Sequence, residues 1–258
     1  MNKLNALFHL LPRNSQLLYR FCRKYANRYN GENDNNILTN GEVNLLKNYL
    51  PTCQTVFDVG SHFGSWSRLA LAVKSDISLH CFEPSWSTFQ RLDGSLSPKT
   101  LYNNFGLGRE QGTRPYYIFA DCATTNSLFL RKGLEDGWGK KMTNRTETVL
   151  IRTLDDYCRE KNIARIDFLK IDTEGGEYDI LCGARQMLSQ NAIGIVQFEY
   201  GGCFIDAHIL LKDVFEYFEQ FPRYKLFKIF PNEMKMIVRY DQRLENFQYA
   251  NYVAMIQD

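Results

Sequence analysis

Apolar side chains recur at helical spacing through the first part of the chain. Residues 4–11 and 17–25 each show this pattern, and Pro12 separates the two stretches. A polar turn over residues 31–36 follows, and residues 40–49 then resume the helical spacing. The pattern therefore predicts helices in an N-terminal extension, with the polar turn as the best internal boundary.

After this extension, short apolar runs alternate with helical stretches. Five strands are expected at residues 55–60, 78–83, 101–104, 166–172 and 193–200. The helices expected among or after them cover residues 64–73, 85–96, 155–161, 177–189 and 207–220. Such alternation is typical of right-handed crossovers, so we expect an α/β fold with a doubly wound, mostly parallel sheet.

The C-terminal part of the chain breaks this alternation. Residues 224–230, 235–240 and 249–256 are predicted strands with no helix between them, which indicates an antiparallel C-terminal hairpin. Residues 106–150 are irregular, and we expect hairpins or a loop excursion over one sheet edge there. We divide the chain into a helical extension, residues 1–50, and one sheet domain, residues 51–258.

Charge is distributed unevenly between the two ends of the chain. Residues 1–30 hold six basic side chains and no acidic one, whereas residues 31–258 hold 25 basic and 29 acidic residues. This balance argues against a protein that coats nucleic acid. We expect the apolar face of residues 1–30 to pack on the domain. An acidic carrier protein or a peripheral membrane contact through the same residues is the alternative.

Cysteine usage and hydropathy bear on the compartment. The seven cysteines are scattered without a CxxC pair, and their odd number excludes a complete disulfide framework. No apolar run approaches the ~18 residues of a membrane span, and the N-terminus does not show the pattern of a signal peptide. We therefore expect a cytoplasmic protein with reduced thiols.

Polar groups follow the predicted parallel strands at the point where each strand ends. Ligands of open α/β sheets bind outside these carboxyl ends, so the groups are candidates for one common site. They are Asp58, Gly60, Ser61, His62 and Gly64 after the first strand, Glu83 and Pro84 after the second, Asn104 after the third, Asp172 and Glu174 after the fourth, and Glu199 at the fifth.

The first two strand ends suit a cofactor that contains a nucleoside. Gly60 and Gly64 allow a ligand to approach the turn backbone and the free N–H groups of the next helix. Glu83 lies about 20 residues further on, where an acid accepts hydrogen bonds from a ribose diol. We expect Pro84 to lie beside it and Asn104 to lie near the adenine.

Residues of the first turn distinguish between classes of cofactor. Ser61 and His62 stand where a nicotinamide enzyme favours glycine against the pyrophosphate. Asp58 at the start of the turn would repel a pyrophosphate but would suit the ammonium group of S-adenosylmethionine (SAM). The antiparallel finish of the sheet agrees with the seven-stranded class I methyltransferase pattern.

A closer resemblance rests on six segments of the chain. VFDVGSHFG, CFEPSWSTFQRL, NNFGLG, TLDDYC, IDFLKIDTEGGEYDILCGA and FEY resemble the successive motifs of the FkbM family of SAM-dependent methyltransferases. The resemblance covers roughly residues 54–257 and implies a Rossmann-like fold, SAM as cofactor and a hydroxyl acceptor on a natural product, sugar or glycan. It also implies that Asn126 and Ser127 approach the cofactor. Two positions depart from the family pattern: His62 replaces its usual asparagine, and Gly176 its common alanine.

Three carboxylates are the candidate catalytic residues. Methyl transfer to an alcohol requires alignment of donor and acceptor and removal of the hydroxyl proton. Asp172 and Glu199 end adjacent strands, and Glu174 begins the next turn; crowding of carboxylates raises their pKa values and makes better bases. Glu177 is expected to cap the helix that it begins. Lys170 shares a strand face with Asp172, so we expect an internal ion pair.

Other interpretations stay open at this point. A divalent cation held by Asp172 and Glu199, with His208, is one alternative, but no spacing fixes a metal site, and none is predicted. A nicotinamide-dependent oxidoreductase and a non-catalytic nucleoside-binding subunit are the alternatives to a methyltransferase. Aromatic residues that either line the acceptor pocket or fill the core under a long loop are Tyr116, Tyr117, Phe119, Phe129 and Trp138.

Overall fold

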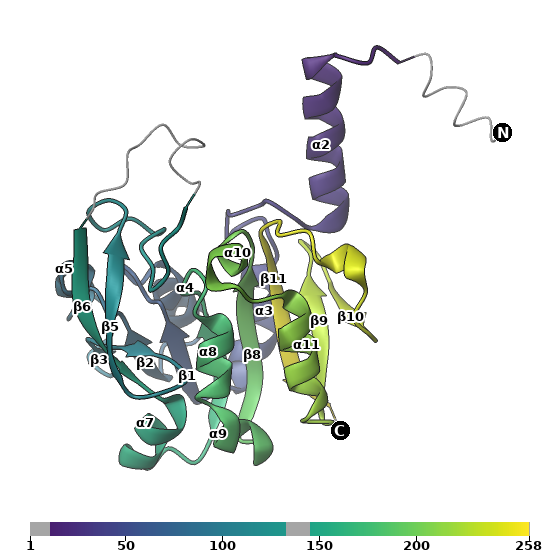
Figure 1. The fold of residues 1–258 in the computed structure, drawn as a ribbon. Helices are drawn as coiled ribbons and strands as arrows, with labels where there is room; N and C mark the ends of the chain where they lie inside the picture. Colours follow the sequence, from purple (N-terminus) through teal and green to yellow (C-terminus); the bar gives the residue numbers. More distant parts are fainter. Residues whose placement is uncertain (1–10, 133–144, 258) are drawn as a thin grey trace.

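A central sheet organises the structure, which is a computed structural model that describes residues 11–132 and 145–257. The strands of this sheet are β1 (Thr55–Val59), β2 (Ser78–Phe82), β3 (Leu101–Asn103), β7 (Ile166–Ile171), β8 (Ile193–Tyr200), β9 (Tyr224–Ile229), β10 (Met234–Ile237) and β11 (Ala250–Ile256). They lie in the order β10-β9-β11-β8-β7-β1-β2-β3 (Figure 1).

The direction of the strands confirms the predicted fold class. β3, β2, β1, β7 and β8 pair in parallel, whereas β11 runs antiparallel between β8 and β9. The expected number of seven strands is wrong, because the described sheet has eight. The backbone N–H of Phe230 donates to the carbonyl of Glu233 (2.8 Å), and this tight turn returns β10 antiparallel along β9 as the added edge strand.

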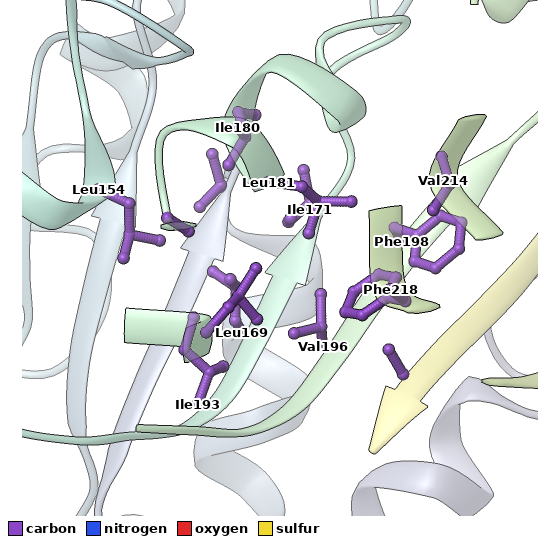
Figure 2. Close-up of a cluster of buried hydrophobic side chains, with 14 of the residues drawn as sticks. Leu154, Leu169, Ile171, Ile180, Leu181, Ile193, Val196, Phe198, Val214 and Phe218 are labelled. Atoms are coloured by element: carbon purple, nitrogen blue, oxygen red, sulfur yellow. The ribbon is translucent and has the colours of Figure 1, made fainter. Parts of the chain in front are cut away.

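Helices cover both faces of the sheet and divide the core into two clusters. The helices that pack on the sheet are α3 (Glu42–Tyr49), α4 (Ser65–Val73), α5 (Trp86–Leu92), α7 (Leu154–Glu160), α8 (Glu177–Cys182), α9 (Arg185–Ser189) and α11 (Leu211–Glu219). α7, α8, α9 and α11 bury apolar residues on one face, where Leu169, Phe198, Val214 and Phe218 belong to one buried cluster (Figure 2). α3, α4 and α5 bury theirs on the opposite face.

Three expected helices have different ends in the structure. The helix predicted over 177–189 breaks between α8 and α9, where Ala184 leaves helical geometry with φ −106° and ψ 14°. The preceding Gly183 lies so close to the Gly108 carbonyl that an added Cβ would meet it at 2.1 Å. The helix predicted over 207–220 begins only at Leu211, as α11, because the left-handed residue His208 ends the preceding helix α10 (Cys203–Ala207). The helix predicted over 85–96 ends at Leu92, just before Gly94 with its positive φ.

A second, smaller sheet forms the expected excursion over one edge. Its strands are β4 (Gly106–Leu107), β5 (Gly112–Ile118) and β6 (Arg145–Arg152), in the order β4-β6-β5. β5 and β6 pair antiparallel along seven residues, which confirms the expected pairing in this region. Short 3-10 helices at Leu50–Thr52 and Gln242–Leu244 complete the described elements.

The N-terminal helix α2 (Gln16–Asn30) stands away from the rest of the molecule (Figure 1). It begins at Ser15, whose side chain accepts a hydrogen bond from Leu18 N (3.2 Å), and ends at Gly31 with φ 64°. None of its residues is buried, so the expected packing of this apolar face on the domain is wrong for α2. The division of the chain at residue 50 stays a prediction.

Two further findings concern the helices and thiols of the described residues. No helix among residues 11–132 and 145–257 combines the length and apolarity needed to cross a membrane. All seven cysteines carry free thiols.

Candidate functional site

A cavity of about 570 Å³ opens at the carboxyl ends of the central parallel strands. Of the residues that the sequence singled out, those that line it are Gly60, His62, Glu83, Pro84, Asp172, Glu174 and Glu199. The remaining four, Asp58, Ser61, Gly64 and Asn104, do not line it. The structure thus brings the expected cofactor turn and the three candidate carboxylates to one cavity.

The turn after β1 owes its shape to a glycine and to close backbone contacts. Gly60 has φ 79°, and an added Cβ would lie 1.8 Å from the carbonyl oxygen of Asp172. The N–H groups of Gly60 and Ser61 both donate to the carbonyl of Phe82 (3.0 Å each). Ser61 Oγ donates to the carbonyl of Asp58 (2.6 Å), so its role is to hold the turn rather than to face the cavity.

Glu83 presents a nearly enclosed carboxylate at the end of β2. Its side chain is 4% exposed and accepts hydrogen bonds from the backbone N–H groups of His62 (3.1 Å) and Ser85 (3.0 Å). Burial raises the pKa of Glu83 to about 7, although these two bonds oppose the shift. Asn104 Nδ2 donates to the carbonyls of Glu83 (3.0 Å) and Pro84 (3.1 Å), so Asn104 fixes the backbone of this corner.

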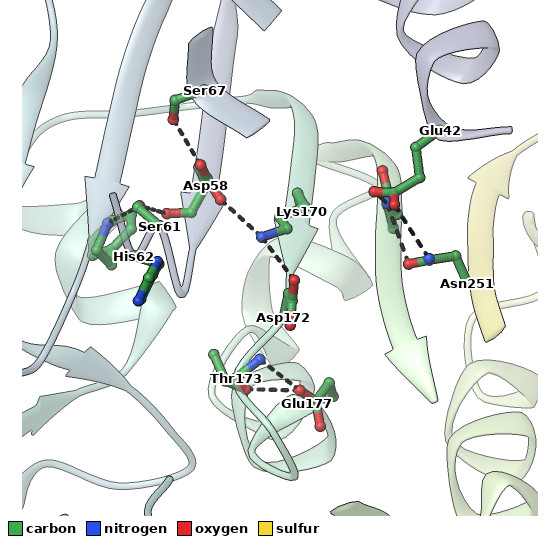
Figure 3. A network of polar contacts seen from close by, with 12 residues as sticks. Glu42, Asp58, Ser61, His62, Ser67, Lys170, Asp172, Thr173, Glu177 and Asn251 are labelled. Carbon is green, nitrogen blue, oxygen red and sulfur yellow. Dashed lines mark hydrogen bonds and ion pairs between the residues drawn. The ribbon is translucent and has the colours of Figure 1, made fainter. Parts of the chain in front are cut away.

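A chain of charges crosses from β1 to the end of β7 and reaches the cavity at Asp172 (Figure 3). Lys170 Nζ lies 3.2 Å from a carboxylate oxygen of Asp58 and 3.2 Å from one of Asp172. Burial lowers the pKa of Lys170, but the two carboxylates outweigh it and the net shift is upward. Ser67 Oγ donates to the other oxygen of Asp58 (2.6 Å), which is fully buried. The expected Lys170–Asp172 pair is confirmed. The side chain of Asp58 contacts Lys170 and Ser67 and does not line the cavity.

The acidic side of the cavity contains Glu174 and Glu199. Burial raises the pKa of Glu199 well above its ordinary value, and the nearby carboxylates of Asp172 and Glu174 add to the shift. Burial also raises the pKa of Glu174, against the effect of an ion pair with Arg131. Arg131 Nε lies 3.3 Å from Asp206, so one buried guanidinium neutralises two carboxylates. Glu199 is therefore the candidate carboxyl without an ionic partner among these contacts.

Glu177 holds the loop between β7 and α8. Its carboxylate accepts hydrogen bonds from Thr173 N (2.7 Å), Thr173 Oγ (3.0 Å) and Gly175 N (2.9 Å), and its side chain is fully buried. The expected helix cap is wrong, because these donors belong to the loop before α8 and no side chain caps the start of this helix. Gly64 has a similar structural role, since it is the left-handed residue that precedes α4.

The loop after β5 covers the cavity from another side. Asn126 lines the cavity, and its Oδ1 accepts hydrogen bonds from Phe119 N (2.7 Å) and Ala120 N (3.3 Å). Ser127 Oγ instead donates to the carbonyl of Glu174 (2.7 Å). His62 Nε2 lies 2.8 Å from the carbonyl of Cys122, which can only accept, so the ring donates from this nitrogen.

Several lining residues were not predicted from the sequence. Arg131 lies in an irregular segment where apolar residues show no helical or strand spacing. Asn33 and Asn35 belong to the polar turn over residues 31–36, for which the sequence predicts only a boundary between two parts of the chain. Tyr249 comes from the start of the last strand, and its hydroxyl accepts a hydrogen bond from Asn251 (3.1 Å). Among the aromatic residues that were predicted, Tyr116 lines the cavity, while Trp138 lies outside the described residues.

The residues that could ligate a divalent cation in the structure differ from the set Asp172, Glu199 and His208 considered from the sequence. Within the described part of the chain, one group of potential ligands comprises Glu174, Glu199 and Cys203, with ligand atoms within 4.8 Å of one another. His208 is not among them. Burial and the surrounding carboxylates raise the pKa of the Cys203 thiol, and Arg131 already pairs with Glu174. These residues fit a proton-holding site better than a cation site, since a metal requires the thiolate.

Comparisons with known proteins agree with this architecture. The sequence model described as "Methyltransferase FkbM domain" matches residues 58–228, more than half of the chain, and confirms the resemblance. The chain is similar to the 2-O-methyltransferase NoeI of Sinorhizobium fredii, with 24% identity over 194 residues, 70% of this chain and 79% of that protein.

Two solved structures also align with the chain. The N-terminal domain of human METTL16 in complex with SAH covers 86% of this chain and 71% of its own, with 12% identity and a TM-score of 0.45. A TehB-like SAM-dependent methyltransferase from Corynebacterium glutamicum covers 93% and 97%, with 11% identity and a TM-score of 0.44.

Proposed function

The chain belongs to the FkbM family of SAM-dependent methyltransferases, and we propose that it transfers a methyl group to a hydroxyl of a small molecule or glycan. The observation that carries this proposal is the shared cavity, which joins the Gly60 turn and Glu83 on one side to Asp172, Glu174 and Glu199 on the other. The printed name of NoeI, a 2-O-methyltransferase, supports oxygen as the acceptor atom.

The residues on the cofactor side suit SAM. Gly60 keeps the turn in its left-handed conformation against the Asp172 carbonyl and lines the cavity, so a ligand can lie along the turn. Glu83 offers a buried carboxylate, which satisfies the hydroxyls of a ribose diol by charge-assisted hydrogen bonds. His62 lines the adjoining wall. Asp58 stabilises the cofactor side of the cavity through its ion pair with Lys170, and we assign it no direct contact with SAM.

The carboxylates on the other side suit the acceptor. SAM, when bound, supplies an electrophilic methyl group on its sulfonium. We assign Glu199 as the group that takes the hydroxyl proton on a carboxylate oxygen, because it lines the cavity and, unlike Asp172 and Glu174, has no ion pair among the described residues. Asp172, held by Lys170, orients the hydroxyl, and Glu174 keeps Arg131 at the cavity wall. Proton removal in the transition state is typically worth about 100- to 10,000-fold in rate.

Isothermal titration with SAM, S-adenosylhomocysteine and NAD tests the cofactor assignment. We expect binding of the first two and no binding of NAD. Binding of NAD alone would instead support the oxidoreductase alternative. Methyl transfer from labelled SAM to panels of sugars, glycans and hydroxylated small molecules then tests the acceptor class. Transfer only to amines or thiols would refute the hydroxyl assignment.

A further inference from the structure

Helix α2 combines an anchored end with an uncovered apolar face. Phe21, Tyr25 and Tyr29 are 68%, 65% and 73% exposed. Their spacing, together with Leu18, puts them along one side of the helix. Apolar side chains in such a stripe are normally covered, and Figure 1 shows the helix projecting from the body with no element of the described residues beside it.

The segment that follows α2 fixes its end firmly to the domain. Glu32 pairs with Lys228 (2.8 Å), and both side chains are buried. Asn33 N donates to the carbonyl of Tyr249 (2.8 Å). The uncovered face therefore belongs to a helix that the fold holds outward at a defined point. Because Asn33 and Asn35 line the cavity, this point is beside the candidate site.

The charge of α2 indicates the chemistry of what covers it. The helix carries Arg20, Arg23, Lys24 and Arg28 and no acidic residue. Arg20 and Arg23 lie on the side opposite the apolar stripe, Lys24 lies on its flank, and Arg28 lies at its edge. Basic side chains around an apolar stripe are typical of helices that lie in the interface of an anionic bilayer, where long cationic side chains extend to the headgroups.

The aromatic residues favour a lipid surface over another protein. Tyr19, Tyr25 and Tyr29 each join an apolar ring to a hydroxyl, which suits the boundary between acyl chains and headgroups. A second copy of this chain would bring another helix with the same four positive charges and no acid to match them. From the exposed stripe, its basic flanks and its fixed base, we propose that α2 docks the protein on anionic lipid bilayers.

Vesicle co-sedimentation of the full chain tests this proposal without any measurement of activity, so its outcome is independent of the proposed function. We expect binding to phosphatidylcholine vesicles that contain phosphatidylglycerol and little binding to phosphatidylcholine alone. Lys24→Gln/Arg28→Gln should lower the partition coefficient about 30-fold, since each charge contributes about five-fold. Lys47→Gln/Lys99→Gln removes two exposed charges from the body and is the matched control, with an expected change below about two-fold.

A second variant tests the apolar face. Phe21→Ser/Tyr25→Ser keeps the charge of α2 and should also reduce binding to the anionic vesicles. Absence of vesicle binding by the full chain, or binding that rising salt leaves unchanged, would overturn the proposal. Equal losses in the helix and body charge variants would overturn it as well. A dimer in sedimentation equilibrium that the Phe21→Ser/Tyr25→Ser variant abolishes, without vesicle binding, would assign the face to a second copy.

Discussion

Replacing Glu83 by glutamine should weaken SAM binding and change its dependence on pH. The residue is 4% exposed, and each oxygen of its carboxylate accepts one backbone hydrogen bond, so the isosteric amide keeps the shape and one of these bonds while the charge and the other bond are lost. Hydrogen bonds to a charged group contribute about 1.5–3 kcal/mol. Loss of that contribution corresponds to roughly 10- to 150-fold weaker binding.

The raised pKa of Glu83, about 7 in the free protein, sets the direction of the pH effect. Hydrogen bonds from a ribose diol favour the ionised form, so binding lowers this pKa and releases a proton below pH ~7. The affinity of the unaltered protein for SAM should therefore rise about 10-fold between pH ~6 and ~8. In the Glu83→Gln protein this part of the pH dependence should disappear.

Titration calorimetry at several pH values, in buffers of different ionisation enthalpy, measures both affinity and released protons. Glu219→Gln removes an exposed carboxylate at the end of α11 and is the control for the change in net charge. A folded Glu83→Gln protein with the affinity and proton release of the unaltered chain would refute the assignment of Glu83 to the ribose.

Stability gives an independent test of the same pKa. A carboxyl group whose pKa is raised on folding contributes stability below its unfolded-state pKa of 4.5, and this contribution is lost as the pH rises through about 7. The difference between these two pKa values corresponds to about 3 kcal/mol in the free energy of unfolding. Glu83→Gln should therefore flatten the fall in stability between these pH values, as measured by denaturant titration; an unchanged slope would contradict the pKa.

Three further predictions concern the acceptor side and the core. Asp172→Asn and Glu199→Gln should each lower turnover, with the general base worth about 100- to 10,000-fold, while SAM affinity stays within a few-fold; full activity of both variants in a methyl-transfer assay would place the base elsewhere. Lys170→Met leaves the fully buried Asp58 without its cation and should cost about 3–5 kcal/mol in denaturant unfolding, whereas a loss below about 1 kcal/mol would show that the pair is not required. Leu169→Ala, at a fully buried position of β7, should cost about 2–5 kcal/mol in the same assay, and a smaller loss would mean that the core refills the cavity.

The extent of prediction differs between the sheet and its edges. The strand at 193–200 was predicted with its observed bounds. A strand buried on both faces is mostly apolar, and such a run can be recognised in the sequence alone. The strand at 235–240 was also predicted, but its place as the eighth strand at the edge of the sheet needed pairing information. β10 has exposed residues such as Met236, and its place at the edge depends on the turn from β9. The order in which antiparallel strands lie in a sheet depends on contacts between distant parts of the chain, so the spacing of apolar residues does not predict it.

The candidate site shows the same division. Gly60, Glu83, Asp172 and Glu199 were predicted because parallel strands deliver their carboxyl ends to one edge, whatever else surrounds them. Whether an acid faces the cavity or the interior is decided by contacts from other strands. The sequence assigned Asp58 to the ligand, whereas Lys170 and Ser67 engage its side chain behind the cavity.

What the sequence determined by itself is the set of local elements and the chemistry at strand ends, because both follow from neighbours along the chain. Tertiary structure alone decided which distant segments complete the cavity. Asn33 and Tyr249 are joined by a backbone hydrogen bond across more than 200 residues, and no local pattern predicts such a pair. It also decided that α2 keeps its apolar stripe uncovered. The helical spacing of apolar residues shows that one face of a helix is apolar, but what covers that face depends on how the rest of the chain folds.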